Sequence, residues 1–314
     1  MKPIYILCLH NVRTGGPEAI HQLSDALIEQ GFDARMVYYD WGHVSALERA
    51  EPQPGYRFCS EPPYMRCQFE EYARYKTNIV SEIPNREGVI VVLPETLCHL
   101  APKFDKATVL IWWLSVDNGF GALSRVNLNH LRARNVDHAA QSRYAARFIE
   151  ALGLPFAGML SDYTIDLCEY AKPMLVRERP KLVAFNTNHK VIADWPGIIL
   201  EIAKRDIEIE CVPVRGDRRQ VADLFAKARV YVDLGCQPGK DRMPREAASM
   251  NCKPLVLDVG AGARDFVDWC TDGYGLAERI VREVAKQDEW NWAAGYSGEF
   301  DTFREEVSDV FSDL

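Results

Sequence analysis

The sequence contains no long hydrophobic run, since no apolar stretch approaches the roughly 18 residues that a membrane-spanning helix needs. The apolar run from Ile4 to Leu9 ends at the polar His10, so it is also too short for the apolar region of a signal peptide. These absences predict a protein without a transmembrane segment that works in the cytoplasm.

Basic residues and paired cysteines are also scarce. The 37 Lys and Arg are outnumbered by 45 Asp and Glu, which gives a formal net charge of −8. This balance argues against nucleic acid as a partner, because phosphate backbones bind net-basic faces. The nine cysteines are scattered and include no C-x-x-C pair. Their odd number and their spacing argue against a disulfide framework or a zinc ribbon and indicate reduced thiols.

The chain has ample material for globular domains. Its 314 residues exceed the roughly 100–200 of a typical domain, and 47% of them are apolar. Short apolar runs alternate along the chain with longer segments of helical periodicity. Runs such as 89–93 and 108–114 are apolar without alternation, which is typical of parallel strands covered by helices on both faces. The sequence therefore predicts an α/β fold of two Rossmann-like domains in tandem.

The domain boundaries follow from the same pattern. Weak periodicity around 160–179 separates a first domain, predicted at 1–165, from a second at 166–290. A helical apolar repeat predicts an amphipathic helix within 291–314. The segment 42–65 is rich in Pro, Gly and aromatic residues and is predicted to be irregular. The expected strands are 4–9, 34–39, 89–93, 108–114, 136–140, 182–185, 207–214, 230–234 and 255–259.

The loops that follow these strands are the expected ligand-binding segments. Ligands of open parallel sheets bind beyond the carboxyl ends of the strands, and two such sheets predict a site in the cleft between their facing loop edges. The first loop ends in Gly15 and Gly16, which let a ligand approach backbone N–H groups at a helix N-terminus. An ordinary tight turn is the alternative. The loop is not G-x-G-x-x-G, which disfavours a nicotinamide-dependent dehydrogenase.

A second loop carries more chemistry. After the strand that ends near residue 234, Gly239, Lys240 and Arg242 precede a helix whose first turn contains Pro244. Backbone amides and the two basic side chains would form an electropositive pocket for a phosphate or a carboxylate. Glu246, just behind, can accept two hydrogen bonds from a vicinal diol such as a ribose. The alternative is that Glu246 only offsets the helix dipole and that the basic residues are solvated.

These two places carry a resemblance to a known family. The order of strand, Gly-Gly loop and helix, together with Pro-Arg-Glu-Ala-Ala-Ser-Met-Asn-Cys-Lys-Pro-Leu-Val at 244–256, resembles glycosyltransferases of the GT-B fold, particularly the retaining family 4 class. The resemblance covers the layout of nearly the whole chain. It implies that Glu246 binds the ribose of a donor nucleotide, that Gly15 and Gly16 lie near the donor phosphates and the acceptor, and that the final helix returns to the first domain.

The sequence also departs from that family. The Glu that usually stands eight positions before the ribose-binding Glu, where it contacts the donor sugar, is Pro238 here. This leaves open the donor sugar and whether the reaction retains or inverts configuration. The usual basic pair after the first strand of the second domain is reduced to Lys190, in the segment that begins at Asn186. The resemblance assigns Asn186 and Lys190 to donor binding, with a plain surface lysine as the alternative.

Polar residues after strands of the first domain are candidates for the acceptor side. Asp117 and Asn118 follow a buried strand, and Asp117 is a candidate base on an acceptor hydroxyl if the enzyme inverts. The alternative is that Asp117 caps the following turn. His10 and Ser142 also follow strands and are candidates for the same side, although a lone His is more often structural.

The resulting hypothesis is a glycosyltransferase that moves a hexosyl or related group from a nucleotide-activated sugar to a glycan, a lipid-linked acceptor or another hydroxyl. Helix N-termini with Lys190, Lys240 and Arg242 would stabilise the departing phosphate, so neither a metal nor another cofactor is expected. The expected setting is polysaccharide biosynthesis, and peripheral association with a membrane stays open. The alternatives are a nucleotide-sugar 2-epimerase of GT-B form and a non-catalytic nucleotide- or glycan-binding relative.

Overall fold

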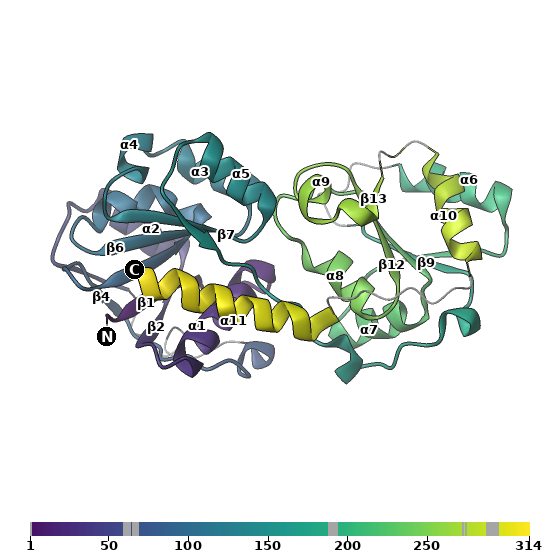
Figure 1. The fold of residues 1–314 in the computed structure, drawn as a ribbon, viewed down its shortest axis with the longest axis horizontal. Coiled ribbons are helices and arrows are strands. Elements are labelled where there is room, and N and C mark those ends of the chain that lie inside the picture. Colours follow the sequence, from purple (N-terminus) through teal and green to yellow (C-terminus); the bar gives the residue numbers. More distant parts are fainter. Residues whose placement is uncertain are drawn as a thin grey trace. The chain divides into compact units, whose positions relative to one another are not determined.

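The computed structural model describes residues 2–58, 64, 69–187, 194–271, 273, 275–286 and 295–314, without the side chains of 267 and 295–297. The chain forms two compact units (Figure 1). Unit 1 contains Met1–Asp162 and Asp301–Leu314, and unit 2 contains Tyr163–Phe300. Each unit is built on a parallel sheet, which confirms the predicted α/β class with two Rossmann-like domains. No helix among the described residues is long and apolar enough to cross a membrane.

Unit 1 has a six-stranded parallel sheet in the order β2-β1-β5-β6-β7-β8. Its strands are β1 (Ile4–Leu9), β2 (Ala34–Tyr39), β5 (Ile90–Pro94), β6 (Thr108–Trp113), β7 (Val136–Ala140) and β8 (Phe156–Met159). A separate antiparallel pair is formed by β3 (Gly55–Arg57) and β4 (Glu82–Pro84). The helices are α1 (Gly15–Glu29), α2 (Trp41–Arg49), α3 (Val116–Leu123), α4 (Leu128–Leu131), α5 (Arg143–Ala151) and the 3₁₀ helices η2 (Glu70–Tyr72) and η3 (Glu95–Lys103).

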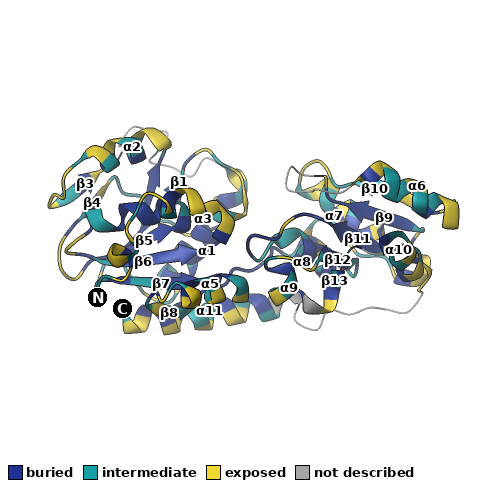
Figure 2. Ribbon diagram, turned by 90° about the horizontal axis from the view of Figure 1, so that it is seen from above, coloured by how far each residue is buried: buried dark blue, intermediate teal, exposed yellow. Residues whose placement is uncertain are grey.

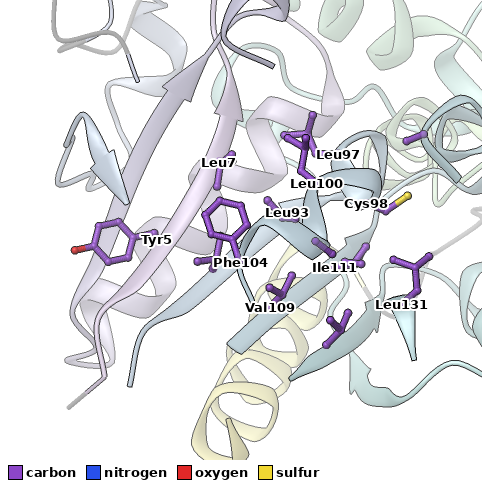
Figure 3. Close-up of a cluster of buried hydrophobic side chains, with 14 of the residues drawn as sticks. Tyr5, Leu7, Leu93, Leu97, Cys98, Leu100, Phe104, Val109, Ile111 and Leu131 are labelled. Carbon is purple, nitrogen blue, oxygen red and sulfur yellow. The ribbon is translucent and has the colours of Figure 1, made fainter. Parts of the chain in front are cut away.

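The core of unit 1 explains why its strands lack alternation. Side chains on both faces of β5 and β6 are buried, and one cluster gathers Leu7, Leu93, Phe104 and Ile111 (Figure 3). Figure 2 shows the same strands buried along their length. Full burial on two faces favours apolar residues at every position, so the continuous runs predict these strands correctly.

Unit 2 has a five-stranded parallel sheet in the order β10-β9-β11-β12-β13. Its strands are β9 (Leu182–Phe185), β10 (Glu210–Pro213), β11 (Val230–Asp233), β12 (Lys253–Leu257) and β13 (Cys270–Thr271). The helices are α6 (Trp195–Arg205), α7 (Arg218–Lys227), α8 (Arg242–Ser249), α9 (Gly262–Asp265), α10 (Leu276–Ala285) and the 3₁₀ helices η4 (Leu167–Glu169), η5 (Val176–Glu178) and η6 (Val267–Trp269). No disulfide joins cysteines in the described part of the chain.

The last helix, α11 (Gly295–Asp313), has residues in both units. In unit 1, Phe303, Val307, Val310 and Phe311 are buried, so this part of the helix has one apolar face. Glu306 of this helix accepts hydrogen bonds from the backbone N–H and the hydroxyl of Ser161, which follows β8, both at 2.6 Å. Apolar burial and these bonds attach α11 to unit 1.

The prediction of an irregular segment at 42–65 is wrong at its start, where α2 forms. Asp40 accepts a hydrogen bond from the backbone N–H of His43 at 2.9 Å, and the His43 side chain completes a capping box. A His at this position of the box is not the usual Glu or Gln, so the start signal is easily missed. Asp217 and Gln220 form a capping box at the start of α7, and their spacing is the usual one for this motif.

Candidate functional site in unit 2 and polar residues of unit 1

A buried carboxylate organises the carboxyl ends of β9 and β11 in unit 2. Asp233 is the last residue of β11 and only 2% exposed. Its Oδ2 accepts hydrogen bonds from the Asn186 amide and the Tyr231 hydroxyl, both at 2.9 Å, and its Oδ1 accepts one from the Gly235 N–H at 3.0 Å. Burial, and next the charge of Asp233, hold the pKa of Tyr231 well above its ordinary value, so the phenol stays a donor. The Asn186 amide therefore supports the loop after β11.

That loop packs closely on the loop after β12. The carbonyl of Gln237 accepts a hydrogen bond from the Ala261 N–H at 2.7 Å. A Cβ at Gly260, whose φ is +56°, would lie 2.2 Å from the same carbonyl oxygen, so only glycine fits there. The Gln237 side chain is 1% exposed, and both its amide oxygen and its amide nitrogen lack a hydrogen-bond partner among the described residues. The two loops form one tightly packed edge.

The predicted donor loop runs from this edge into α8. Gly239 is buried, Lys240 is 24% exposed at its side chain, and Asp241 precedes the helix without a capping bond from its own side chain. Arg242 is the first residue of α8 and Glu246 its fifth, and both are half-buried. Gly239, Lys240 and Arg242 thus lie at the N-terminus of α8, and Glu246 lies in its second turn. In general, backbone N–H groups and cationic side chains at a helix N-terminus favour an anion. Lys190 lies outside the described residues.

The other predicted donor residues, Gly15 and Gly16, lie in unit 1. They are the first two residues of α1, and Gly15 is exposed. A Cβ at Gly16 would approach only a Leu114 side-chain carbon, at 3.9 Å, so packing does not require glycine there. Thr14 precedes the helix and makes no capping bond with its side chain. Gly15 and Gly16 therefore stand at the N-terminus of α1, and the first turn of the helix contains no Lys or Arg.

His10 lies in an aromatic cluster at the end of β1. Its ring stacks on Tyr64 with centroids 4.2 Å apart and meets Tyr38 edge-on at 5.5 Å. Tyr64 donates a hydrogen bond to Asp40 at 2.6 Å, and this bond is the main reason why the pKa of Asp40 is lowered to about 2. His21 bridges the Pro17 carbonyl at 2.6 Å and the Tyr38 hydroxyl at 2.7 Å, and burial lowers its pKa. The cluster holds His10 at 8% exposure.

The remaining candidates of unit 1 differ in accessibility. Asp117 and Asn118 are exposed near the start of α3, and Asp117 lies 3.5 Å from the Tyr144 hydroxyl. Asp117 is the second residue of the helix, where a carboxylate also interacts with the helix dipole. Ser142 is fully buried, and its hydroxyl accepts the Ala145 N–H at 3.1 Å as the N-cap of α5. A hydroxyl in a cap is less available to a substrate than an exposed carboxylate.

Glu95 lies at the carboxyl end of β5 in unit 1 and has a strongly raised pKa. The sequence-based prediction missed this residue. It follows β5 directly, is 4% exposed, and accepts the Leu114 N–H at 3.1 Å. Burial raises its pKa to about 8. Nearby, the Ser115 hydroxyl is buried and has no hydrogen-bond partner among the described residues. The sequence signal that could have identified Glu95 is its position directly after the apolar run of β5.

A cavity of about 480 Å³ in unit 2 lies between α6 and α10 and reaches the carboxyl ends of β11 and β12. Leu234, Leu257 and Leu276 give it an apolar lining, and Asp194, Glu201 and Glu278 contribute acidic groups. The described residues that line it include none of the predicted site residues. Among the described side chains, no three His, Cys, Asp or Glu residues are grouped as a metal site requires.

The fold is similar to that of known two-domain enzymes. A sucrose-phosphate synthase from Thermosynechococcus elongatus matches 99% of this chain and 95% of its own with a TM-score of 0.53 at 12% identity. A putative UDP-N-acetylglucosamine 2-epimerase from Listeria monocytogenes matches 100% and 98% with a TM-score of 0.54 at 10% identity. A glycosyltransferase from Rickettsia africae matches 100% of both chains with a TM-score of 0.51 at 10% identity.

Sequence comparison adds no closer relative, because no protein-family model matches the chain and no curated protein matches it significantly. The structural matches extend over nearly all of each compared chain, at identities that carry information on the fold alone. Together with the two parallel sheets, they show that this protein has the GT-B fold of two Rossmann-like domains.

Proposed function

We propose that the protein is a glycosyltransferase that takes a sugar from a nucleotide-activated donor, with the donor diphosphate bound at the N-terminus of α8. The observation that carries the proposal is the gathering of Lys240, Arg242 and Glu246 around the first turns of that helix. Transferases share the GT-B fold with this chain, as the similarity to the sucrose-phosphate synthase illustrates.

The proposed chemistry is electrostatic. When the glycosidic bond to the donor phosphate breaks, negative charge grows on the leaving diphosphate. Lys240, Arg242 and the helix dipole of α8 stabilise this charge, which lowers the barrier without a metal ion. Glu246, half-buried on the same helix, accepts hydrogen bonds from the ribose hydroxyls. In unit 1, Asp117 and Asn118 are proposed to contact the acceptor, a glycan or another hydroxyl compound, with His10 and Ser142 as supporting residues.

The first test is nucleotide binding. UDP, GDP, ADP, CMP and dTDP are added separately, and the unfolding temperature of the wild type is compared with that of Lys240→Ala and Glu246→Ala. A nucleotide present at 100 times its Kd stabilises the folded protein by about 2.7 kcal/mol, so binding gives a clear shift. We expect one nucleoside diphosphate to raise the unfolding temperature of the wild type and either substitution to reduce that shift. Unchanged binding and sugar transfer in both variants would contradict the proposal.

A nucleotide-sugar 2-epimerase is the second candidate, because the putative epimerase from Listeria monocytogenes has the same fold with a TM-score of 0.54. An epimerase acts on the nucleotide sugar alone, whereas a transferase needs an acceptor hydroxyl. Incubation with UDP-sugars in the absence of any acceptor separates the two. Epimerised product would favour the second candidate, and turnover that appears only when an acceptor is added would favour the first.

A further inference from the structure

Arg245 and Glu299 form a buried ion pair within unit 2. The Arg245 side chain is 1% exposed and that of Glu299 is 6% exposed. Nη1 of Arg245 donates to both carboxylate oxygens of Glu299, at 3.0 and 3.1 Å. Arg245 lies on α8, just after the basic loop, and Glu299 belongs to α11. Two charges are thus removed from water together, an arrangement that persists only when their remaining hydrogen bonds are also satisfied.

Arg245 also donates hydrogen bonds to the basic loop itself. Its Nη2 donates to the Lys240 carbonyl at 2.8 Å, and its Nε donates to the Asp241 carbonyl at 3.3 Å. In a planar trans peptide, the C=O and the following N–H point in opposite directions. Because the Asp241 carbonyl is turned toward the guanidinium, the N–H of Arg242 points away from it, at the N-terminal end of α8. The guanidinium therefore helps to fix the direction of the Arg242 N–H, whereas the Asp241 N–H donates to the Gly239 carbonyl at 2.9 Å.

Glu299 is itself held in place from a second segment. Its Oε2 accepts hydrogen bonds from the backbone N–H of Thr164 at 3.0 Å and from the Thr164 hydroxyl at 3.1 Å. The Lys240 ammonium lies 3.9 Å from its Oε1, too far for a hydrogen bond and close enough for attraction. The carboxylate thus connects the start of unit 2, α11 and the basic loop.

We infer that the Arg245–Glu299 pair positions the anion site: it holds the Lys240 and Asp241 carbonyls, and through them the backbone of the loop and the Arg242 N–H, in the arrangement that binds a diphosphate. This inference rests on the proposed function, and it adds two positioning residues that do not touch the donor. A pair that only stabilises the fold would leave the affinity of the folded protein unchanged. If the pair acted only by its charge, Glu299→Gln would lower the Kd for the diphosphate, because the loop would become more positive.

The decisive variant is Arg245→Lys. Lysine keeps the positive charge beside Glu299, but a single ammonium cannot reach the carboxylate and both carbonyls in the geometry of the guanidinium fork. We expect Arg245→Lys and Glu299→Gln each to raise the Kd for the best-bound nucleotide among UDP, GDP, ADP and dTDP by about tenfold, the scale on which residues behind a binding site act. Calorimetry well below the unfolding temperature of each variant measures this Kd.

Glu283→Gln is the matched control. Glu283 is another buried carboxylate of unit 2, 7% exposed at its side chain and paired with Lys253 at 2.7 Å. We expect this substitution to lower stability but to leave the Kd unchanged. A wild-type Kd in Arg245→Lys, or tighter binding in Glu299→Gln, would overturn the inference while leaving the donor site intact. If the wild type binds none of these nucleotides, the donor site is wrong and the inference with it.

Discussion

Glu95 shows how strongly the position of a single residue can change its chemistry. The carboxyl group follows β5, is almost fully buried and has a pKa raised to about 8 by that burial. In the unfolded chain the same group has an ordinary pKa of roughly 4.3. The folded protein therefore holds the proton more tightly than the unfolded chain does. This contribution to stability is fully present below the unfolded pKa and is lost as the pH rises through the folded value.

Glu95→Gln tests this linkage. The amide keeps an oxygen that can accept the Leu114 N–H, and it does not titrate. Between about pH 5 and pH 8, we expect the wild type to lose up to about 1.4 kcal/mol of unfolding free energy per pH unit more than Glu95→Gln. Urea denaturation of both proteins at several pH values measures the difference. Parallel pH profiles would show that Glu95 titrates normally.

Among the elements, α7 depends on a local motif that the sequence displays. Asp217 accepts the Gln220 N–H at 3.0 Å, and the Gln220 side chain accepts the Asp217 N–H at 2.9 Å. We expect Asp217→Ala to destabilise the helix by about 1 kcal/mol, because the Gln220 N–H loses its capping partner. Hydrogen exchange across 217–228 measures the loss, which corresponds to roughly fivefold faster exchange of the α7 amides if they exchange by local opening.

Asp223, an exposed acid later in the same helix, supplies the control for this prediction. Asp223→Ala also removes one negative charge from α7, but it leaves the capping box intact. Its effect should stay within about 0.5 kcal/mol, as for most surface substitutions. Equal effects of the two variants would mean that charge, and not the cap, determines the stability of α7.

At the scale of the whole molecule, the charge balance sets which polyanions bind. The formal net charge of −8 repels the phosphate backbone of a nucleic acid. We expect no binding of a fluorescent duplex DNA or single-stranded RNA at a physiological ionic strength of about 0.15 M, measured by anisotropy. A nucleoside diphosphate should bind under the same conditions, since it needs only the local positive charge around α8. Micromolar binding of either nucleic acid would contradict the charge argument.

Element type was predictable wherever it depends on neighbouring residues. The continuous apolar runs of β5 and β6 identified these strands, because residues buried on two faces must be apolar at nearly every position. Helix α2 was missed, since its capping box uses His43 in place of the usual Glu or Gln. The loop with Lys240 and Arg242 was found because glycine, proline and basic residues together mark the start of a helix.

The sequence by itself therefore determined the α/β class, most strands and the basic loop before α8, since periodicity and helix-start signals act over a few residues. Only the tertiary structure decided what surrounds that loop. Asp233 and Asn186 meet across 47 positions, and Arg245 and Glu299 across 54. The raised pKa of Glu95 likewise depends on burial by several elements. Contacts and burial of this kind arise when distant segments pack together, and short-range patterns contain no record of which segments those are.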